Sequence, residues 1–172
     1  TYALQKYFRK LLDLPVKYSF NRFKTVIKDI SESLGKKVKF QTTGDQGSLN
    51  KENLNLLHDA LTHLIRNSLD HGIEEPNTRV KNKKEEEAFI KIDCKTSGDD
   101  QLTITLEDDG CGINTDIITK KAIEKGYKTK EDILKMSTSE KLNLIFLPGL
   151  STKERATEIS GRGVGMDVVK EN

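Results

Sequence analysis

Two short stretches in which apolar and polar residues alternate place the strongest constraint on the fold. The apolar positions are Ile90, Ile92 and Cys94 in the first stretch and Leu102, Ile104 and Leu106 in the second. A polar Ser-Gly-Asp-Asp segment at 97–100 separates the two stretches. Alternation with a period of two places the apolar side chains on one face of a strand, and a short polar turn favours antiparallel pairing. The pattern therefore predicts a β-hairpin with one apolar face, which a second layer of structure has to cover.

Helical periodicity in the rest of the sequence supplies that second layer. Apolar residues three and four positions apart predict helices, with a single short strand among them. Helices are predicted at 1–14, 21–34, 50–71, 115–125, 131–146 and from 161 onward, a strand at 38–42, a charged connector at 76–87 and a mobile loop at 147–161. Helices that pack beside a hairpin give a fold of the α+β class.

Composition argues against several classes of protein. The 29 Lys and Arg residues nearly balance the 27 Asp and Glu residues, and a net charge of +2 disfavours a dedicated nucleic-acid binder. No apolar run approaches the roughly 20 residues of a membrane-spanning helix, so we expect no membrane insertion. Cys94 and Cys111 are the only cysteines and lack a metal-ligand spacing, so the cytoplasm is the expected location.

The predicted helix at 50–71 carries a polar stripe beside its apolar face. At about 100° per residue, His63, Asn67, Asp70 and His71 fall in one sector of this helix. An Asn amide oxygen suits Mg²⁺, which keeps several waters and shares its other positions with phosphate oxygens. Asn67 is therefore a candidate Mg²⁺ ligand, and the alternative is a solvated helix face.

An Asp-Asp-Gly-Cys-Gly segment follows the second strand of the predicted hairpin. Gly110 and Gly112 lack the Cβ atoms that would keep a flat ring away from the backbone, and the carboxylate of Asp108 can accept a hydrogen bond from an exocyclic amine. The alternative is an ordinary turn between a strand and a helix, because Asp-Gly pairs are common in turns.

Three glycines stand at the start of the last predicted helix. Gly161, Gly163 and Gly165 expose backbone N–H groups that can bind an anion, and Arg162 adds a full positive charge. No strand precedes them and no Gly-Lys-Ser/Thr sequence closes the segment, so Rossmann and Walker motifs do not fit. A glycine-rich hinge is the alternative.

The order of these motifs resembles the GHKL superfamily of ATP-binding domains. The matching segments are LIRNSLDHG at 64–72, DDGCGI at 108–113, FLPGLSTKE at 146–154 and GRGVGMDVV at 161–169. Together they are similar to the catalytic domains of the CheA family of chemotaxis histidine kinases, from about Leu14 to the chain end. Leu150 differs from the Phe usual at that position, which predicts looser packing of the loop.

The resemblance implies a two-layer α/β sandwich with a mixed, mostly antiparallel sheet that lacks its C-terminal strands. It also implies that 1–14 ends a preceding dimerisation-type helix and that 15–172 is an ATP-binding kinase domain, truncated at its C-terminus. Asn67 would bind Mg²⁺, Asp108 would accept from the adenine amino group, and His63 would be a catalytic base or an orienting group. The residues implied at the ATP site are Asn67, Asp70, His71, Asp108, Gly110, Gly112, Ser151, Thr152, Gly161, Arg162, Gly163, Val164, Gly165 and Met166.

The implied reaction is transfer of the γ-phosphoryl group of MgATP to a histidine on a separate phosphotransfer domain. The implied partners are that domain, a downstream response regulator, a receptor-coupling protein and a second copy of the chain, the last two through regions outside this sequence. Two alternatives stay open, a nucleotide-binding regulatory module without phosphotransfer and a GHKL ATPase. A carboxylate at position 63 would favour hydrolysis of ATP, so His63 argues against the ATPase.

Overall fold

The computed structural model describes residues 13–44, 47–97, 101–147 and 150. The chain divides into two compact units, Thr1–Gly112 and Ile113–Asn172. Most of the predicted loop and all of the predicted last helix lie outside the described residues, as do the first twelve residues of the predicted helix at 1–14. Ser151, Thr152, Gly161, Arg162, Gly163, Val164, Gly165 and Met166 also lie outside them.

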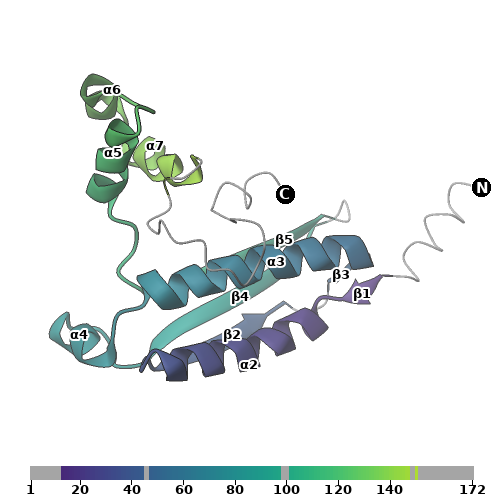
Figure 1. Ribbon diagram of the computed structural model, residues 1–172. Coiled ribbons are helices and arrows are strands. Elements are labelled where there is room, and N and C mark those ends of the chain that lie inside the picture. Colours follow the sequence, from purple (N-terminus) through teal and green to yellow (C-terminus); the bar gives the residue numbers. More distant parts are fainter. Residues whose placement is uncertain (1–12, 45–46, 98–100, 148–149, 151–172) are drawn as a thin grey trace, which may run out of the picture. The chain divides into compact units, whose positions relative to one another are not determined.

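The first unit is built around a mixed sheet of three strands in the order β2-β4-β5 (Figure 1). Strand β2 (Val38–Thr43) pairs in parallel with β4 (Ala88–Thr96), and β4 pairs antiparallel with β5 (Leu102–Asp108). The register of the second pair places Cys94 opposite Ile104 and Ile92 opposite Leu106. The predicted hairpin, the predicted strand and the mixed character of the sheet are thus confirmed.

Two long helices cover the apolar face of this sheet. Helix α2 (Lys17–Ser33) and helix α3 (Lys51–Asn67) contribute buried residues to one core with the strands, which confirms the α+β class. Strands β1 (Leu14–Pro15) and β3 (Ser48–Leu49), which directly precede α2 and α3 in the chain, form a short antiparallel ribbon. The buried members of this core are Val16, Phe20, Phe23, Ile27, Leu61, Ile65, Leu69, Ile73, Ala88, Ile90, Ile92 and Cys94.

Three predictions for the first unit are wrong in part. Leu14, the last residue of the helix predicted at 1–14, lies in strand β1. Helix α2 begins at Lys17 rather than at residue 21, because the N–H of Phe20 donates to the Val16 carbonyl at 3.1 Å and the Phe20 side chain is buried in the core. The segment 76–87 is more than a charged connector, since it contains helix α4 (Pro76–Lys81). Pro76 occupies the first turn of this helix, where its missing N–H and fixed φ are tolerated.

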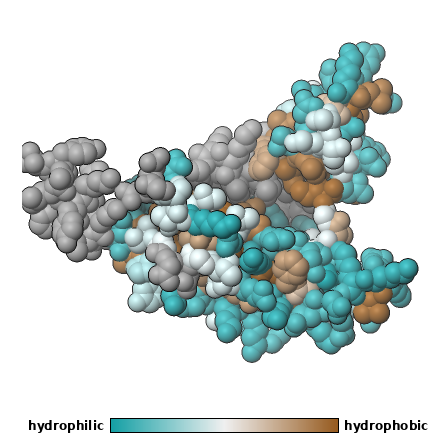
Figure 2. Space-filling view, turned by 180° about the vertical axis from the view of Figure 1, so that it is seen from behind, coloured by the Kyte–Doolittle hydropathy of each residue, from teal (hydrophilic) through white to brown (hydrophobic). Residues whose placement is uncertain are grey.

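The second unit consists of short helices. Helix α5 (Thr115–Glu124) matches its prediction, but the helix predicted at 131–146 is divided into α6 (Lys130–Lys135), α7 (Thr138–Asn143) and a 3₁₀ turn (Leu144–Phe146). The break falls at Met136, because Ser137 is extended and caps the next helix by accepting from the N–H of Glu140. In Figure 2, hydrophobic residues stand out on the part of the surface that contains these helices, where Leu134 is 83% exposed.

A separate small core holds the described part of this unit together. Its buried residues are Ile118, Ala122, Leu144 and Leu150. Leu150 is 1% exposed, so looser packing at this position is not observed despite the smaller side chain. None of the described helices is both long enough and apolar enough to span a membrane.

Candidate functional site

Helix α3 widens into a single π-helical turn, Ser68–Gly72, at the end of its polar stripe. The N–H of Ile73 donates to the carbonyl of Ser68 at 2.7 Å, which closes this wider turn. The α-helical spacing of about 100° per residue therefore fails after Asn67. This turn changes the angular spacing of Asp70 and His71 relative to His63 and Asn67, so their place in the predicted polar stripe stays a prediction. Asp70 is half-buried here and His71 is exposed.

His63 and Asn67 lie one helical turn apart and touch. The amide nitrogen Nδ2 of Asn67 lies 3.0 Å from Nε2 of His63, and both side chains are half-buried. An amide nitrogen can only donate, so Nε2 of His63 is the acceptor when the imidazole carries its proton on Nδ1. The contact holds the amide nitrogen toward His63, and the carboxamide oxygen is the atom of Asn67 that can bind a hard cation.

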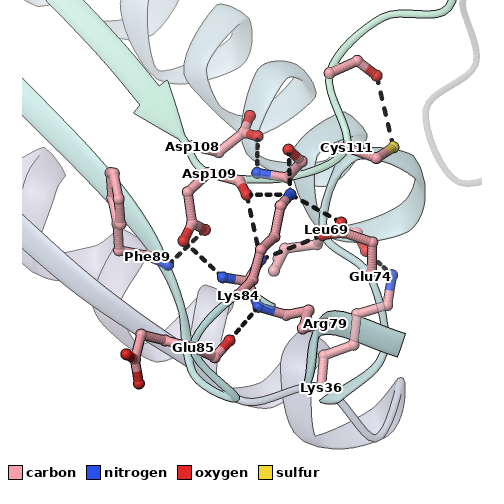
Figure 3. Close-up of polar contacts among 12 residues, drawn as sticks. Lys36, Leu69, Glu74, Arg79, Lys84, Glu85, Phe89, Asp108, Asp109 and Cys111 are labelled. Carbon is pink, nitrogen blue, oxygen red and sulfur yellow. Dashed lines mark hydrogen bonds and ion pairs between the residues drawn. The ribbon is translucent and has the colours of Figure 1, made fainter. Parts of the chain in front are cut away.

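The end of strand β5 is tied to the π-helical turn through Asp108. The hydroxyl of Ser68 donates to Oδ2 of Asp108 at 2.7 Å. The backbone N–H of Gly110 donates to Oδ1 of the same carboxylate at 3.0 Å (Figure 3). Ser68 is buried, whereas Asp108 is only half-buried. The two predicted motifs, more than 35 residues apart in sequence, therefore meet at one carboxylate.

Gly110 is required by a contact between two backbones. A Cβ atom at this position would lie 2.3 Å from the carbonyl oxygen of Gly72, and the next residue, Cys111, donates its N–H to that same oxygen at 2.7 Å. Gly112 has a φ of +72° and open space around it. The sequence suggested that both glycines admit a flat ring. At position 110, however, the close approach to Gly72 already excludes any side chain.

A buried cluster of charges lies directly behind this loop and was missed by sequence reasoning. Arg79 of α4 is 1% exposed, and its guanidinium donates to the Asp109 carboxylate at 2.6 Å and to the Asp109 carbonyl at 3.2 Å. It also donates to the Glu85 carbonyl at 2.7 Å and pairs with Glu74 at 3.2 Å. No periodic or motif signal marks Arg79, which stands in a segment where charge is expected on the surface.

Lys84 completes the cluster from the segment after α4. Its ammonium group donates to Glu74 at 2.8 Å, to the Asp109 carbonyl at 3.0 Å and to the Gly110 carbonyl at 2.9 Å (Figure 3). Burial disfavours the charged form of Glu74. That effect is outweighed by the hydrogen bonds that Glu74 accepts from Lys84 and from the backbone, together with the positive charges of Lys84 and Arg79. The pKa of Glu74 therefore lies below its ordinary value.

The oxygen atoms of Asp108 and Asn67 have the chemistry needed to bind a nucleotide and its magnesium ion. A carboxylate offers about four acceptor positions, and Asp108 uses one on each oxygen for Ser68 and Gly110, so capacity remains for an amine. Within the described ranges, no group of three or more His, Cys, Asp or Glu side chains gathers around a possible metal position. A lone Asn ligand is compatible with Mg²⁺, because water and phosphate oxygens supply its other ligands.

Comparison with known proteins identifies the family. Residues 52–171 match the family described as histidine kinase-, DNA gyrase B-, and HSP90-like ATPase. The chain is 39% identical over 171 residues to the chemotaxis protein CheA of Halobacterium salinarum, and this match covers 99% of the chain and 25% of that protein. It is 43% identical over 159 residues to CheA of Borreliella burgdorferi, covering 92% of the chain and 18% of that protein.

These relatives are much longer than the matched region, since the chain spans about a quarter of their length or less. A solved histidine kinase domain from the blue-light-activated kinase of Erythrobacter litoralis is 19% identical, with a TM-score of 0.45 over 60% of this chain and 45% of that one. The predicted resemblance to CheA proteins is confirmed at the level of sequence similarity. The chain belongs to the family of histidine kinase-, DNA gyrase B- and HSP90-like ATPases.

Proposed function

We propose that this chain binds MgATP as the catalytic domain of a chemotaxis-type histidine kinase and transfers the γ-phosphoryl group to a histidine on a separate phosphotransfer domain. The observation that carries the proposal is the hydrogen bond of 2.7 Å between Ser68 and Asp108, which joins the helical Asn motif to the Asp-Gly motif. Similarity to CheA proteins over nearly the whole chain supports the same function.

Asp108 is proposed as the residue that selects adenine. Its carboxylate is held by one donor on each oxygen, and the remaining acceptor positions can receive the adenine amino group. Gly112 and the backbone beside Gly110 would border the base. Asp70, His71, Ser151, Thr152 and the segment 161–166 are proposed to line the rest of the ATP site.

Asn67 is proposed as the protein ligand of Mg²⁺. When bound, Mg²⁺ would neutralise phosphate charge, which is a main source of rate enhancement in phosphoryl transfer. The 3.0 Å contact between His63 and Asn67 supports an orienting role for His63, because it fixes the direction of the carboxamide. A role for His63 as the catalytic base is also proposed, and it would require Nε2 to exchange its contact with Asn67 for the substrate histidine.

The partners follow from the proposed reaction. They are a histidine-containing phosphotransfer domain and a downstream response regulator, with a receptor-coupling protein and a second copy of the chain engaged through other regions. The proposed location is the cytoplasm.

A binding experiment tests the ATP site. Asp108→Ala should abolish the rise in melting temperature that ATP causes, because a ligand stabilises only the folded state that binds it. Asn67→Ala should remove mainly the part of that rise that depends on Mg²⁺. Glu107→Gln, an exposed neighbour on β5, serves as the matched control and should behave as wild type. Equal ATP-induced shifts in wild type and Asp108→Ala would contradict the assignment of adenine binding.

A transfer experiment tests the reaction. The chain is mixed with ATP labelled in the γ-phosphoryl group and an isolated phosphotransfer domain, and we expect label on the domain. Binding of ATP without transfer would indicate a regulatory module instead. Repeated release of phosphate without any acceptor would indicate an ATPase.

A further inference from the structure

The peptide unit between Asp109 and Gly110 is held from both sides. Its carbonyl oxygen accepts from Arg79 at 3.2 Å and from Lys84 at 3.0 Å, while its N–H donates to Oδ1 of Asp108 at 3.0 Å. In a planar trans peptide the C=O and N–H groups point in opposite directions. Two cations that hold the oxygen therefore turn the N–H toward the Asp108 carboxylate.

The anchor of this arrangement is a buried side chain with several hydrogen-bond partners. Arg79 is 1% exposed and uses its side chain on Glu74, Glu85 and Asp109. The second oxygen of the Asp109 carboxylate accepts from the N–H of Phe89 at 3.0 Å, at the start of the central strand β4. Asp109 is thus bound to both the sheet and α4, whereas, among these described residues, the carboxylate of the adjacent Asp108 forms no hydrogen bond with Arg79 or Phe89.

Lys84 fixes the following carbonyl as well. Its ammonium group reaches Asp109 and Gly110 at 3.0 and 2.9 Å and is anchored by Glu74 at 2.8 Å. Its side chain is 33% exposed, whereas that of Glu74 is 10% exposed. Hydrogen bonds to charged groups in such partly buried positions are stronger than neutral ones, so the orientation of both carbonyls is well determined.

We infer that Arg79 and Lys84, which lie outside every predicted nucleotide motif, are positioning residues that set the direction of the Asp108 carboxylate and thereby the selectivity for adenine. The inference rests on the proposed role of Asp108. Without the two cations the peptide unit can rotate, and Asp108 loses one of its two donors. A ligand that uses the adenine amino group should then lose affinity, whereas a ligand without that group should not.

The test compares ATP with inosine triphosphate, which carries an oxygen in place of the adenine amino group. Dissociation constants for both are measured with the full chain, and wild type should prefer ATP. Lys84→Met keeps the length of the side chain but removes its charge, and should lower the preference about fivefold. Arg79→Lys keeps the positive charge but cannot make all the hydrogen bonds of the guanidinium group to Glu74, Glu85 and Asp109. It should lower the preference for ATP further than Lys84→Met does. Lys81→Met, an exposed lysine of α4, is the matched control and should leave the preference unchanged.

A second background separates positioning from simple loss of structure. Asp108→Asn should itself reduce the preference for ATP, and adding Lys84→Met should then change it less than about twofold. The inference would be overturned if Lys84→Met weakened the binding of ATP and of inosine triphosphate equally. It would also be overturned if the preference for ATP depended on Asp108 but was unchanged in both Lys84→Met and Arg79→Lys. A wild-type chain that binds neither nucleotide, or prefers ATP regardless of Asp108→Asn, would instead overturn the proposed function.

Discussion

The two units of the chain are stabilised in different ways. In the first unit, residues from α2, α3 and the sheet share one core, and the described site residues are joined by contacts between distant segments. The second unit has a small core of four buried residues among those described, and its helices are short. The placement of His63, Asn67 and Asp108 therefore depends on packing between segments distant in sequence, whereas the helices of the second unit depend largely on signals within a few residues of each helix start.

Capping supplies those local signals in the second unit. Thr129 with Asp132, and Ser137 with Glu140, form reciprocal capping boxes at the starts of α6 and α7. The pKa of Asp132 is lowered chiefly by the hydroxyl of Thr129, and that of Glu140 chiefly by the backbone N–H of Ser137. Each box satisfies donors that a helix start leaves without a partner inside the helix.

The largest expected effect lies in the first core. Ile90 is fully buried in the central strand β4, and Ile90→Ala should lower the free energy of unfolding by about 4 kcal/mol, because it removes buried methyl groups and leaves a cavity. Urea denaturation measures the loss. Hydrogen exchange should accelerate in β4, β5 and α3, and an equal acceleration in α5 to α7 would show that the two units are not independent.

A smaller effect is expected from the matching change in the second core. Leu144 is 4% exposed, and Leu144→Ala should cost about 2 kcal/mol, at the low end for such changes because its packing shell is small. Leu134→Ala, at a site that is 83% exposed, is the control and should be close to neutral. Hydrogen exchange should rise only in the second unit, and a rise in β4 would contradict the division.

The smallest expected effect concerns the charge cluster and depends on pH. Glu74→Gln should lower the free energy of unfolding by about 1.5 kcal/mol at pH 7, since it removes charged hydrogen-bond acceptors from Lys84 and Arg79. The pKa of Glu74 is lower in the folded than in the unfolded state. The contribution of its charged form to the free energy of unfolding is therefore fully present above pH 4.5 and is lost as the pH falls below that value.

Denaturation at several pH values measures this dependence. The difference between wild type and Glu74→Gln should shrink as the pH falls from 4.5, and a difference independent of pH would contradict the assignment. Glu86→Gln is the control, because Glu86 forms a largely exposed ion pair with Lys37 and should contribute little.

The elements with a clear period could be predicted from the sequence. The hairpin β4–β5 and helix α3 follow from alternation and from the leucine spacing, because burial on one face imposes those periods. Helix α4 could not be found in this way, since its buried side chain is a charged Arg79 and its length is only six residues. Apolar spacing also continues across the break at Met136, and the signal that marks the break is the Ser-x-x-Glu capping box at 137–140, which periodicity does not detect.

The candidate site shows the same limit. The residues with recognisable chemistry, His63, Asn67 and Asp108, could be named from their motifs. Their relation could not, because the π-helical turn changes the angular spacing after Asn67 and brings Ser68 onto Asp108. The second aspartate, Asp109, gave no signal of its separate role, since only the fold reveals that it binds Arg79.

The parallel pairing of β2 with β4 has a consequence for the order of folding. It brings together Val38 and Ala88, fifty positions apart, whereas the turn of the β4–β5 hairpin joins Thr96 to Leu102. Closing the longer loop costs more entropy, so the hairpin should form early and the parallel pair late. Asn67 lies inside that long connection and Asp108 at the end of the hairpin. If the proposed ATP site is correct, nucleotide affinity should emerge only when β2 has paired with β4, so that ATP binding would report the formation of this parallel pair.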